Sequence, residues 1–198
     1  MKEFSYKNYS YQPFFEHYFK HNPENPIGNV PEPILIDLKS KIPSYVDTII
    51  NLGCSNGRDF IPFQDDYNCI GFDLAPLGYI DWVCKTKNLT YYQCSIEDYM
   101  NNVITTHLQV HMRKDLSTSL VYTQGALCYV SPNNQEKFIS HLLDNNCKNM
   151  IFHEYPPEYT GIHSNFTFQP CWHHQKYLDL FERKKYKGEC VGFIHLDR

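Results

Sequence analysis

Apolar residues in this chain gather in short runs that alternate with longer amphipathic segments. Short apolar runs bounded by polar residues or glycine indicate buried strands, whereas apolar positions three or four residues apart indicate helices. The strands predicted on this basis cover residues 47–52, 68–73, 89–94, 118–123, 148–154 and 188–195. The helices predicted between them cover residues 57–63, 76–81, 96–112, 132–145 and 171–185.

Strands that alternate with helices predict βαβ units, a mostly parallel sheet and a three-layer α/β/α architecture. Before the first strand, aromatic residues at helical spacing predict a short helix near 12–20, and a further helix is expected near 33–41. The length suits a single domain over residues 1–198. Within it we expect an N-terminal helical cap at 1–45 and an α/β core at 46–198.

Composition indicates a globular protein with a small partner. Hydrophobic residues make up 42% and aromatic residues 16% of the 198 positions, which is too apolar for a disordered chain. The formal net charge is -4, and the densest basic segment, 183–187, is short. An extended contact with a phosphate backbone is therefore disfavoured, and with it nucleic acid as a partner. The sequence leaves the oligomeric state open.

The eight cysteines are scattered and form no C-x-x-C pair, so free buried thiols in a reducing compartment explain them best. His107 and His111 have a helical metal-ligand spacing, but no glutamate lies beside His107 and no third ligand is evident. We predict exposed helix positions for both and no metal site. The N-terminus lacks an apolar signal region, and no apolar run has the length of a membrane span. We expect a cytoplasmic protein without membrane contact.

The stretch TIINLGCSNGRDF, residues 48–60, has the pattern of a buried strand, a glycine turn and a helix start. Asp73 follows twenty residues after Gly53, at the end of the second apolar run. A glycine turn lets a ligand approach the backbone without meeting a Cβ. An acid at the tip of the next strand can accept both hydroxyls of a ribose. Together they predict a nucleoside-bearing ligand across the carboxyl ends of two parallel strands.

The spacing of the glycines narrows the range of ligands that the turn can accept. A dinucleotide fingerprint requires G-x-G-x-x-G, but here Ser55 stands at the second glycine position and Arg58 at the third. A pyrophosphate would meet those side chains, so a nicotinamide oxidoreductase is disfavoured. A small zwitterionic tail fits the turn better.

Two segments of the chain resemble motifs of a known protein family. The segment LGCSNGRD, residues 52–59, resembles the first motif of class I S-adenosylmethionine-dependent methyltransferases, and Gly71-Phe72-Asp73 resembles their second. The resemblance extends over residues 47 to about 155. It implies a Rossmann-like fold with strand order 3-2-1-4-5 and an antiparallel C-terminal edge. It also implies S-adenosylmethionine as cofactor and S-adenosylhomocysteine as product. The family usually ends with two further strands, whereas this chain has room for little more than one.

The resemblance implies a cofactor site built from the ends of the first four strands. Its expected members are Gly53, Cys54, Ser55, Gly57, Asp73, Leu74, Ser95, Ile96, Gln124 and Gly125. Family members often carry an acid where Ser95 stands, which puts the usual contact to the adenine amino group in doubt. Ser95 with Asp98 also has the pattern of a capping box. Arg58 and Asp59 either hold the amino-acid tail or lie exposed on the helix, and exposure is the expectation.

The acceptor side of the reaction is expected after the fifth strand. A general base is needed only when the acceptor holds a proton at neutral pH. His153 and Glu154 are the candidate catalytic residues, although alternation along a strand allows only one of them to face a pocket. A polar strand end without catalytic function explains them equally well. Tyr11, Tyr18 and Tyr155 are expected to contact the acceptor.

The function predicted from these features is S-adenosylmethionine-dependent methyl transfer to an O or N atom of a small-molecule acceptor. The alternatives are a methyltransferase acting on nucleic acid or protein, and a non-catalytic S-adenosylmethionine-binding module. The absence of an added recognition domain and the acidic net charge favour the small molecule.

Overall fold

The computed structural model describes residues 35–36, 39–55, 57–74, 89–101, 115–127, 130, 132–154, 162–163, 166–167 and 190–195. The helices expected near 12–20, 76–81 and 171–185 lie outside these ranges, as does part of the helix expected near 33–41. No helix in the described part of the chain is long and apolar enough to span a membrane.

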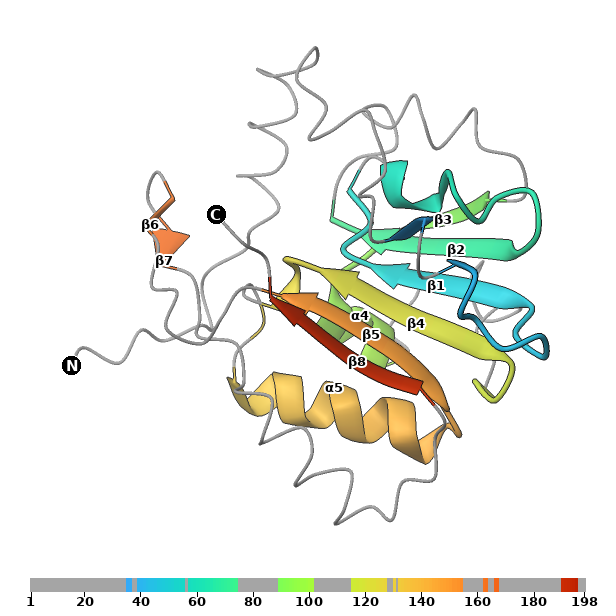
Figure 1. The fold of residues 1–198 in the computed structure, drawn as a ribbon. Helices are drawn as coiled ribbons and strands as arrows, with labels where there is room; N and C mark the ends of the chain where they lie inside the picture. The colour runs from blue at the N-terminus through green and yellow to red at the C-terminus, as the bar shows by residue number, and fades with distance from the viewer. Residues whose placement is uncertain are drawn as a thin grey trace.

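A six-stranded sheet forms the centre of the fold, in the order β3-β2-β1-β4-β5-β8 (Figure 1). Every neighbouring pair in this sheet is parallel. The strands are β1 Thr48–Leu52, β2 Asn68–Asp73, β3 Leu89–Gln93, β4 Ser119–Gln124, β5 Asn149–Glu154 and β8 Cys190–His195. They match the predicted strands to within two residues at each end, and the order 3-2-1-4-5 is confirmed. Since all six run the same way, their carboxyl ends share one edge of the sheet.

The expected antiparallel C-terminal edge is wrong, because β8 pairs with β5 in parallel. A parallel neighbour requires a crossover of about a dozen residues or more, and the connection over 155–189 is long enough for one. Two short strands within this connection, β6 Ile162–His163 and β7 Phe166–Thr167, form a separate antiparallel pair.

The helix predicted over 57–63 is replaced by a single 3-10 turn, η2, at Arg58–Phe60, followed by turns. Pro62 lacks the N–H group that an α-helix would direct at the Arg58 carbonyl. That carbonyl instead accepts a hydrogen bond from the N–H of Ile61, at 3.0 Å. The sequence therefore allows a tight turn here but no regular α-helix.

Helices α4 and α5 lie on the same side of the sheet (Figure 1). Helix α5, Pro132–Asp144, agrees with the predicted 132–145, and its proline occupies the first turn, where no N–H is needed. Helix α4, Ile96–Asn101, begins where predicted. The remainder of the predicted helix over 96–112 lies outside the described residues.

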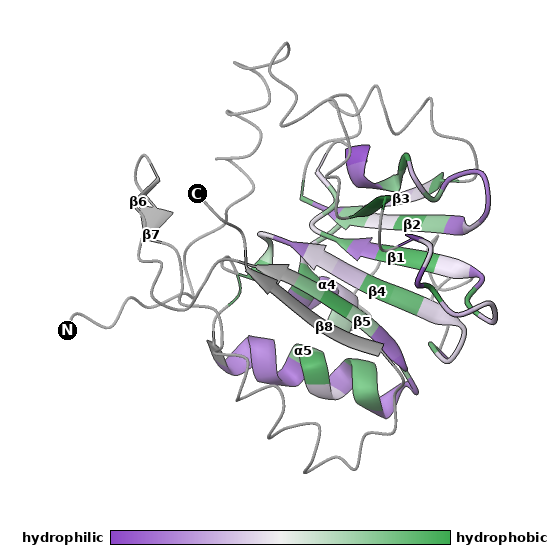
Figure 2. Cartoon of the chain, viewed as in Figure 1, coloured by the Kyte–Doolittle hydropathy of each residue, from purple (hydrophilic) through white to green (hydrophobic). Residues whose placement is uncertain are grey.

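The core has two parts, one on each face of the sheet. Helices α4 and α5 contribute Tyr99, Phe138 and Leu142 to the larger part, while Phe60 and Phe63 pack onto the opposite face. Strand β1 is buried along its whole length because both faces are covered, and its centre is apolar in Figure 2. Thr48 and Asn51 are the buried polar residues of this strand.

Candidate functional site

The turn after β1 is left-handed at three described positions. Gly53 has a φ of 82°, Ser55 of 47° and Gly57 of 78°. Glycine adopts such angles at little cost, whereas an L-residue with a Cβ is disfavoured by about 1–2 kcal/mol. The backbone conformation itself therefore favours glycine at both glycine positions of the first motif, while Ser55 adopts its positive φ at that cost.

Three successive N–H groups of this turn point at the tip of β2. The N–H groups of Gly53 and Cys54 both donate to the Phe72 carbonyl, at 2.7 and 3.1 Å. The N–H of Ser55 donates to Oδ2 of Asp73, at 2.8 Å. The glycine turn and the acid that are predicted to share one site are thus joined directly by a hydrogen bond.

The backbone of Asp73 is held as well. Its carbonyl accepts from the N–H of Cys94, at 2.9 Å, and from the hydroxyl of Tyr91, at 3.2 Å. The carboxylate therefore stands in a fixed position at the carboxyl end of β2. It remains partly accessible, since Asp73 is only half-buried.

Two glycines make room for close packing around the turn. A Cβ on Gly53 would lie 2.4 Å from the Cβ of Ala126, which follows β4. A Cβ on Gly71 in β2 would lie 2.7 Å from the sulfur of Cys54. The turn is consequently pressed against β2 on one side and against the end of β4 on the other.

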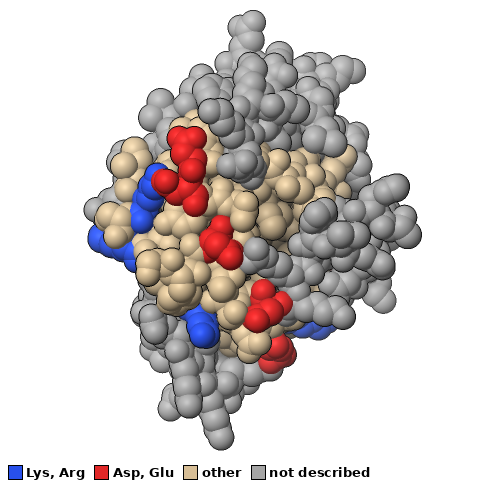
Figure 3. Space-filling model, turned by 90° about the vertical axis from the view of Figure 1, so that its right-hand side faces the viewer, with Lys and Arg blue, Asp and Glu red and all other residues tan. Residues whose placement is uncertain are grey.

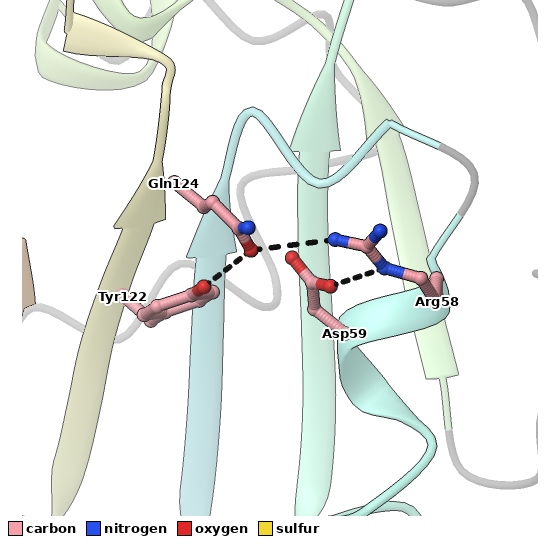
Figure 4. A network of polar contacts seen from close by, with 4 residues as sticks. All are labelled: Arg58, Asp59, Tyr122 and Gln124. Carbon is pink, nitrogen blue, oxygen red and sulfur yellow. Dashed lines mark hydrogen bonds and ion pairs between the residues drawn. The ribbon is translucent and has the colours of Figure 1, made fainter. Parts of the chain in front are cut away.

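Arg58 and Asp59 form a network with the end of β4 (Figure 4). Nε of Arg58 donates to Oδ1 of Asp59, at 2.8 Å, and its Nη2 makes a long contact of 3.5 Å to Oε1 of Gln124. The hydroxyl of Tyr122 donates to the same oxygen, at 2.5 Å. The side chains of Arg58 and Asp59 are only 12% and 9% exposed, so the expectation that both lie exposed on a helix is wrong.

Among the residues that the structure describes, two polar side chains beside the turn have no hydrogen-bond partner. They are Asn51, whose amide oxygen and nitrogen are both buried and unpaired, and Ser55, whose hydroxyl is in the same state. Asn51 is the register partner of Gly71 in β2 and of Tyr122 in β4, so it lies between the two sides of the site. Buried polar groups are normally paired, and unpaired ones call for a ligand or water. Asn51 was not among the predicted site residues, although an amide within an apolar strand is a visible signal in the sequence.

The thiols near the site are protonated at neutral pH. Burial raises the pKa of Cys54 well above its usual range, and the neighbouring carboxylates of Asp73 and Asp59 raise it further. Burial raises the pKa of Cys94 to about 12. Because a thiolate is the reactive form, these cysteines are poor nucleophiles. No group of three potential metal ligands occurs among the described residues.

Ser95 caps helix α4. Its hydroxyl donates to Oδ2 of Asp98, at 2.9 Å, and accepts from the N–H of Asp98, at 3.0 Å. The capping box predicted from the sequence is confirmed. Ile96 is only 8% exposed and belongs to the core, while the Leu74 carbonyl accepts from the side chain of Gln93. Contacts of Ser95, Ile96 and Leu74 with a cofactor stay predictions.

The candidate catalytic residues end β5. His153 is the register partner of Gln124, the last residue of β4, and Glu154 pairs with His195 of β8. This places the backbone of His153 at the ligand edge of the sheet, on the far side of β4 from Asp73. The expected acceptor contacts at Tyr11, Tyr18 and Tyr155 lie outside the described residues.

No protein-family model and no curated protein sequence matches this chain. Several solved structures match this chain in fold. A 1,6-didemethyltoxoflavin-N1-methyltransferase of Burkholderia thailandensis, with 1,6-didemethyltoxoflavin and S-adenosylhomocysteine bound, matches with a TM-score of 0.61 at 9% identity, over 87% of this chain and 75% of its own. A TehB-like SAM-dependent methyltransferase of Corynebacterium glutamicum matches with a TM-score of 0.53 at 12% identity, over 87% of this chain and 83% of its own.

A third match comes from a structure concerned with the conversion of a disulfide bond into a thioacetal group during echinomycin biosynthesis. Its TM-score is 0.50 at 16% identity, over 70% of this chain. The present chain spans 56% of the length of that protein. At such identities the likeness concerns the arrangement of the backbone.

Proposed function

Starting from the fold of S-adenosylmethionine-dependent methyltransferases, which this chain has, we propose that the protein transfers a methyl group from S-adenosylmethionine to an O or N atom of a small-molecule acceptor. The donor rests against the turn after β1, and its product is S-adenosylhomocysteine. The acceptor approaches from the side of β4 and β5.

The hydrogen bond from the N–H of Ser55 to Oδ2 of Asp73 carries this proposal. It ties an acid at the end of β2 to a left-handed glycine turn at the end of β1, at the edge of a parallel sheet where ligands bind. A carboxylate in this position can accept from the 2′ and 3′ hydroxyls of a ribose. Hydrogen bonds to an ionised group are about twice as strong as neutral ones.

The unpaired groups beside the turn support a polar ligand. The amide of Asn51 and the hydroxyl of Ser55 are buried without partners in the described part of the chain, and leaving such groups unsatisfied costs about 1–3 kcal/mol each. The zwitterionic amino-acid end of the donor, or water held beside it, supplies the missing partners. These residues therefore fit the proposed cofactor.

S-adenosylmethionine supplies a methyl group already activated by the positive charge on its sulfur. The protein then has to align the acceptor with that methyl and to exclude water. His153 takes the acceptor's proton when the acceptor is a hydroxyl or a protonated amine, since an imidazole titrates near neutral pH. Glu154 orients the imidazole or binds a cationic acceptor. The tyrosines at 11, 18 and 155 line the acceptor side, with residues 1–45 as a cap.

A small-molecule acceptor is supported by two observations. The methyltransferase of similar fold from Burkholderia thailandensis holds 1,6-didemethyltoxoflavin. On the face in Figure 3, acidic and basic side chains of the described residues are interspersed and form no continuous basic surface. Nucleic-acid binding normally requires such a surface. The free buried thiols fit a reducing compartment, so we place the reaction in the cytoplasm.

Calorimetry and isotope labelling together test this function. We expect the purified protein to bind S-adenosylmethionine and S-adenosylhomocysteine, and not NAD. The protein is then incubated with methyl-labelled S-adenosylmethionine and with metabolite, RNA and protein fractions in separate reactions. We expect the label to appear in the metabolite fraction. Label in the RNA or protein fraction would show that the acceptor is RNA or protein and not a small molecule. Binding without any transfer would indicate a non-catalytic module, and no binding would end the proposal.

A further inference from the structure

The side chain of Gln124 is held from two sides at the end of β4. Its Oε1 accepts from the hydroxyl of Tyr122, at 2.5 Å, and contacts Nη2 of Arg58, at 3.5 Å. Tyr122 is itself buried in β4, and Arg58 is anchored to Asp59. The carboxamide is therefore fixed between the strand and the turn.

This arrangement decides which end of the amide faces the ligand edge. A guanidinium group only donates hydrogen bonds, so the amide atom that faces Arg58 must be the oxygen. The nitrogen is then turned away from both neighbours, and Figure 4 shows it on the side of the carboxyl ends of the strands. Within the described part of the chain, the Nε2 of Gln124 has no hydrogen-bond partner.

The order of the strands indicates which part of the donor meets this nitrogen. Asp73 ends β2, the turn follows β1, and Gln124 ends β4, which lies on the other side of β1. A donor whose ribose is bound at β2 and whose chain crosses the turn brings its amino-acid end to β4. The donor's carboxylate needs hydrogen-bond donors there, and the three-residue η2 is too short to provide the N-terminus of an α-helix.

We infer, on the basis of the proposed function, that Gln124 donates from Nε2 to the carboxylate of the donor's amino-acid tail and makes the site selective for donors that carry it. Tyr122 and Arg58 are positioning residues that keep the amide in this orientation. The charge of Arg58 is balanced by Asp59 at 2.8 Å. The selectivity therefore rests on a neutral donor of fixed direction rather than on an excess positive charge.

The inference is tested by comparing two ligands that differ in the tail. S-adenosylhomocysteine carries the amino-acid tail, whereas methylthioadenosine has the same nucleoside and sulfur without it. Gln124→Glu keeps the shape but replaces the donor by a carboxylate. We expect calorimetry to show a 10- to 100-fold loss of affinity for S-adenosylhomocysteine, and a change within twofold for methylthioadenosine.

Two further variants distinguish a loss of the Gln124 orientation from a general disturbance of the fold. Tyr122→Phe removes only the hydroxyl and should weaken S-adenosylhomocysteine binding by about three- to tenfold, again without affecting methylthioadenosine. Tyr45→Phe removes a hydroxyl that bonds Asn149, outside the proposed site, and should leave both affinities unchanged. If Gln124→Glu does not fold, Gln124→Met provides the same comparison without a charge.

An equal loss for both ligands, or no loss for either, would overturn the role of Gln124. These outcomes are distinct from a failure of the proposed function, in which the unaltered protein binds neither ligand. Unaltered protein that binds both ligands equally well would also contradict the inference, because the tail would then contribute nothing.

Discussion

Gly53 and Ala126 approach so closely that a Cβ on Gly53 would lie 2.4 Å from the Cβ of Ala126. The first glycine of the turn thus does more than admit a ligand. It lets the segment after β4 pack against the end of β1, which brings Gln124 close to Arg58. The shape of the site on the β4 side depends on this contact.

Replacement of Gly53 by alanine should destabilise the protein by about 2–5 kcal/mol. The new Cβ meets Ala126, and the φ of 82° disfavours any residue with a Cβ. The free energy of unfolding is measured by urea titration. Combining Gly53→Ala with Ala126→Gly removes the collision and should leave a loss of about 1–2 kcal/mol from the backbone alone. If the loss of unfolding free energy in the double variant equals the sum of the losses in the two single variants, the contact between positions 53 and 126 does not contribute.

Replacement of Asp73 by asparagine should lower the affinity for S-adenosylhomocysteine by about 10- to 100-fold, because it removes a charged acceptor for the ribose hydroxyls. Calorimetry gives the affinity. Asp65→Asn, an exposed acid in the turn after η2, serves as the matched control for the loss of one charge. Equal affinities in the two variants would remove Asp73 from the cofactor site.

Replacement of His153 by glutamine should lower kcat by about 100-fold while leaving S-adenosylhomocysteine binding within twofold. A general base acts on the acceptor, so its loss affects turnover and not the donor's affinity. Steady-state assays with the acceptor identified by labelling provide the measurement. Normal turnover in His153→Gln would show that the acceptor needs no base, or that another group provides it.

Stability should fall as the pH rises above about 9. Burial raises the pKa of Cys69 and of Cys147 to about 12, whereas these thiols titrate near 9.0 in the unfolded chain. Between those values the folded state binds more protons than the unfolded state, so the free energy of unfolding decreases with pH. At pH 10 the loss is about 1 kcal/mol for each thiol. Urea titrations at pH 8 and pH 10 measure it, and Cys69→Ala should show a correspondingly smaller decrease.

The strands could be predicted from the sequence because both faces of the sheet are covered. A parallel strand buried on two faces appears as a continuous apolar run, and 49–52 would be such a run without Asn51. The direction of β8 could not be predicted in the same way. Direction is set by the path of the connection over 155–189, and an apolar run has the same pattern whichever way the strand points.

The site was predictable as far as it depends on local conformation. Glycines at 53 and 57, with an acid at the end of the next strand, have a spacing that few other arrangements require. The burial of Arg58 and Asp59 was not predictable, because the sequence pattern favoured a longer helix with an exposed face. In the 3-10 turn that stands in place of that helix, Arg58 contacts Gln124 at the end of β4, and Gln124 is 66 residues away in sequence.

Because all strands of the sheet run the same way, residues at their carboxyl ends lie along one edge of the sheet. The spacing between strands then gives the approximate distance between any two of these residues. Neighbouring strands lie about 4.8 Å apart, so Asp73 on β2 and His153 on β5 are separated by three steps, or about 14 Å. A donor whose sugar is fixed at one end of that distance has its sulfur well short of the other end. A second molecule that lies between the sulfur and the end of β5 would therefore have its dimensions bounded by the remaining interval.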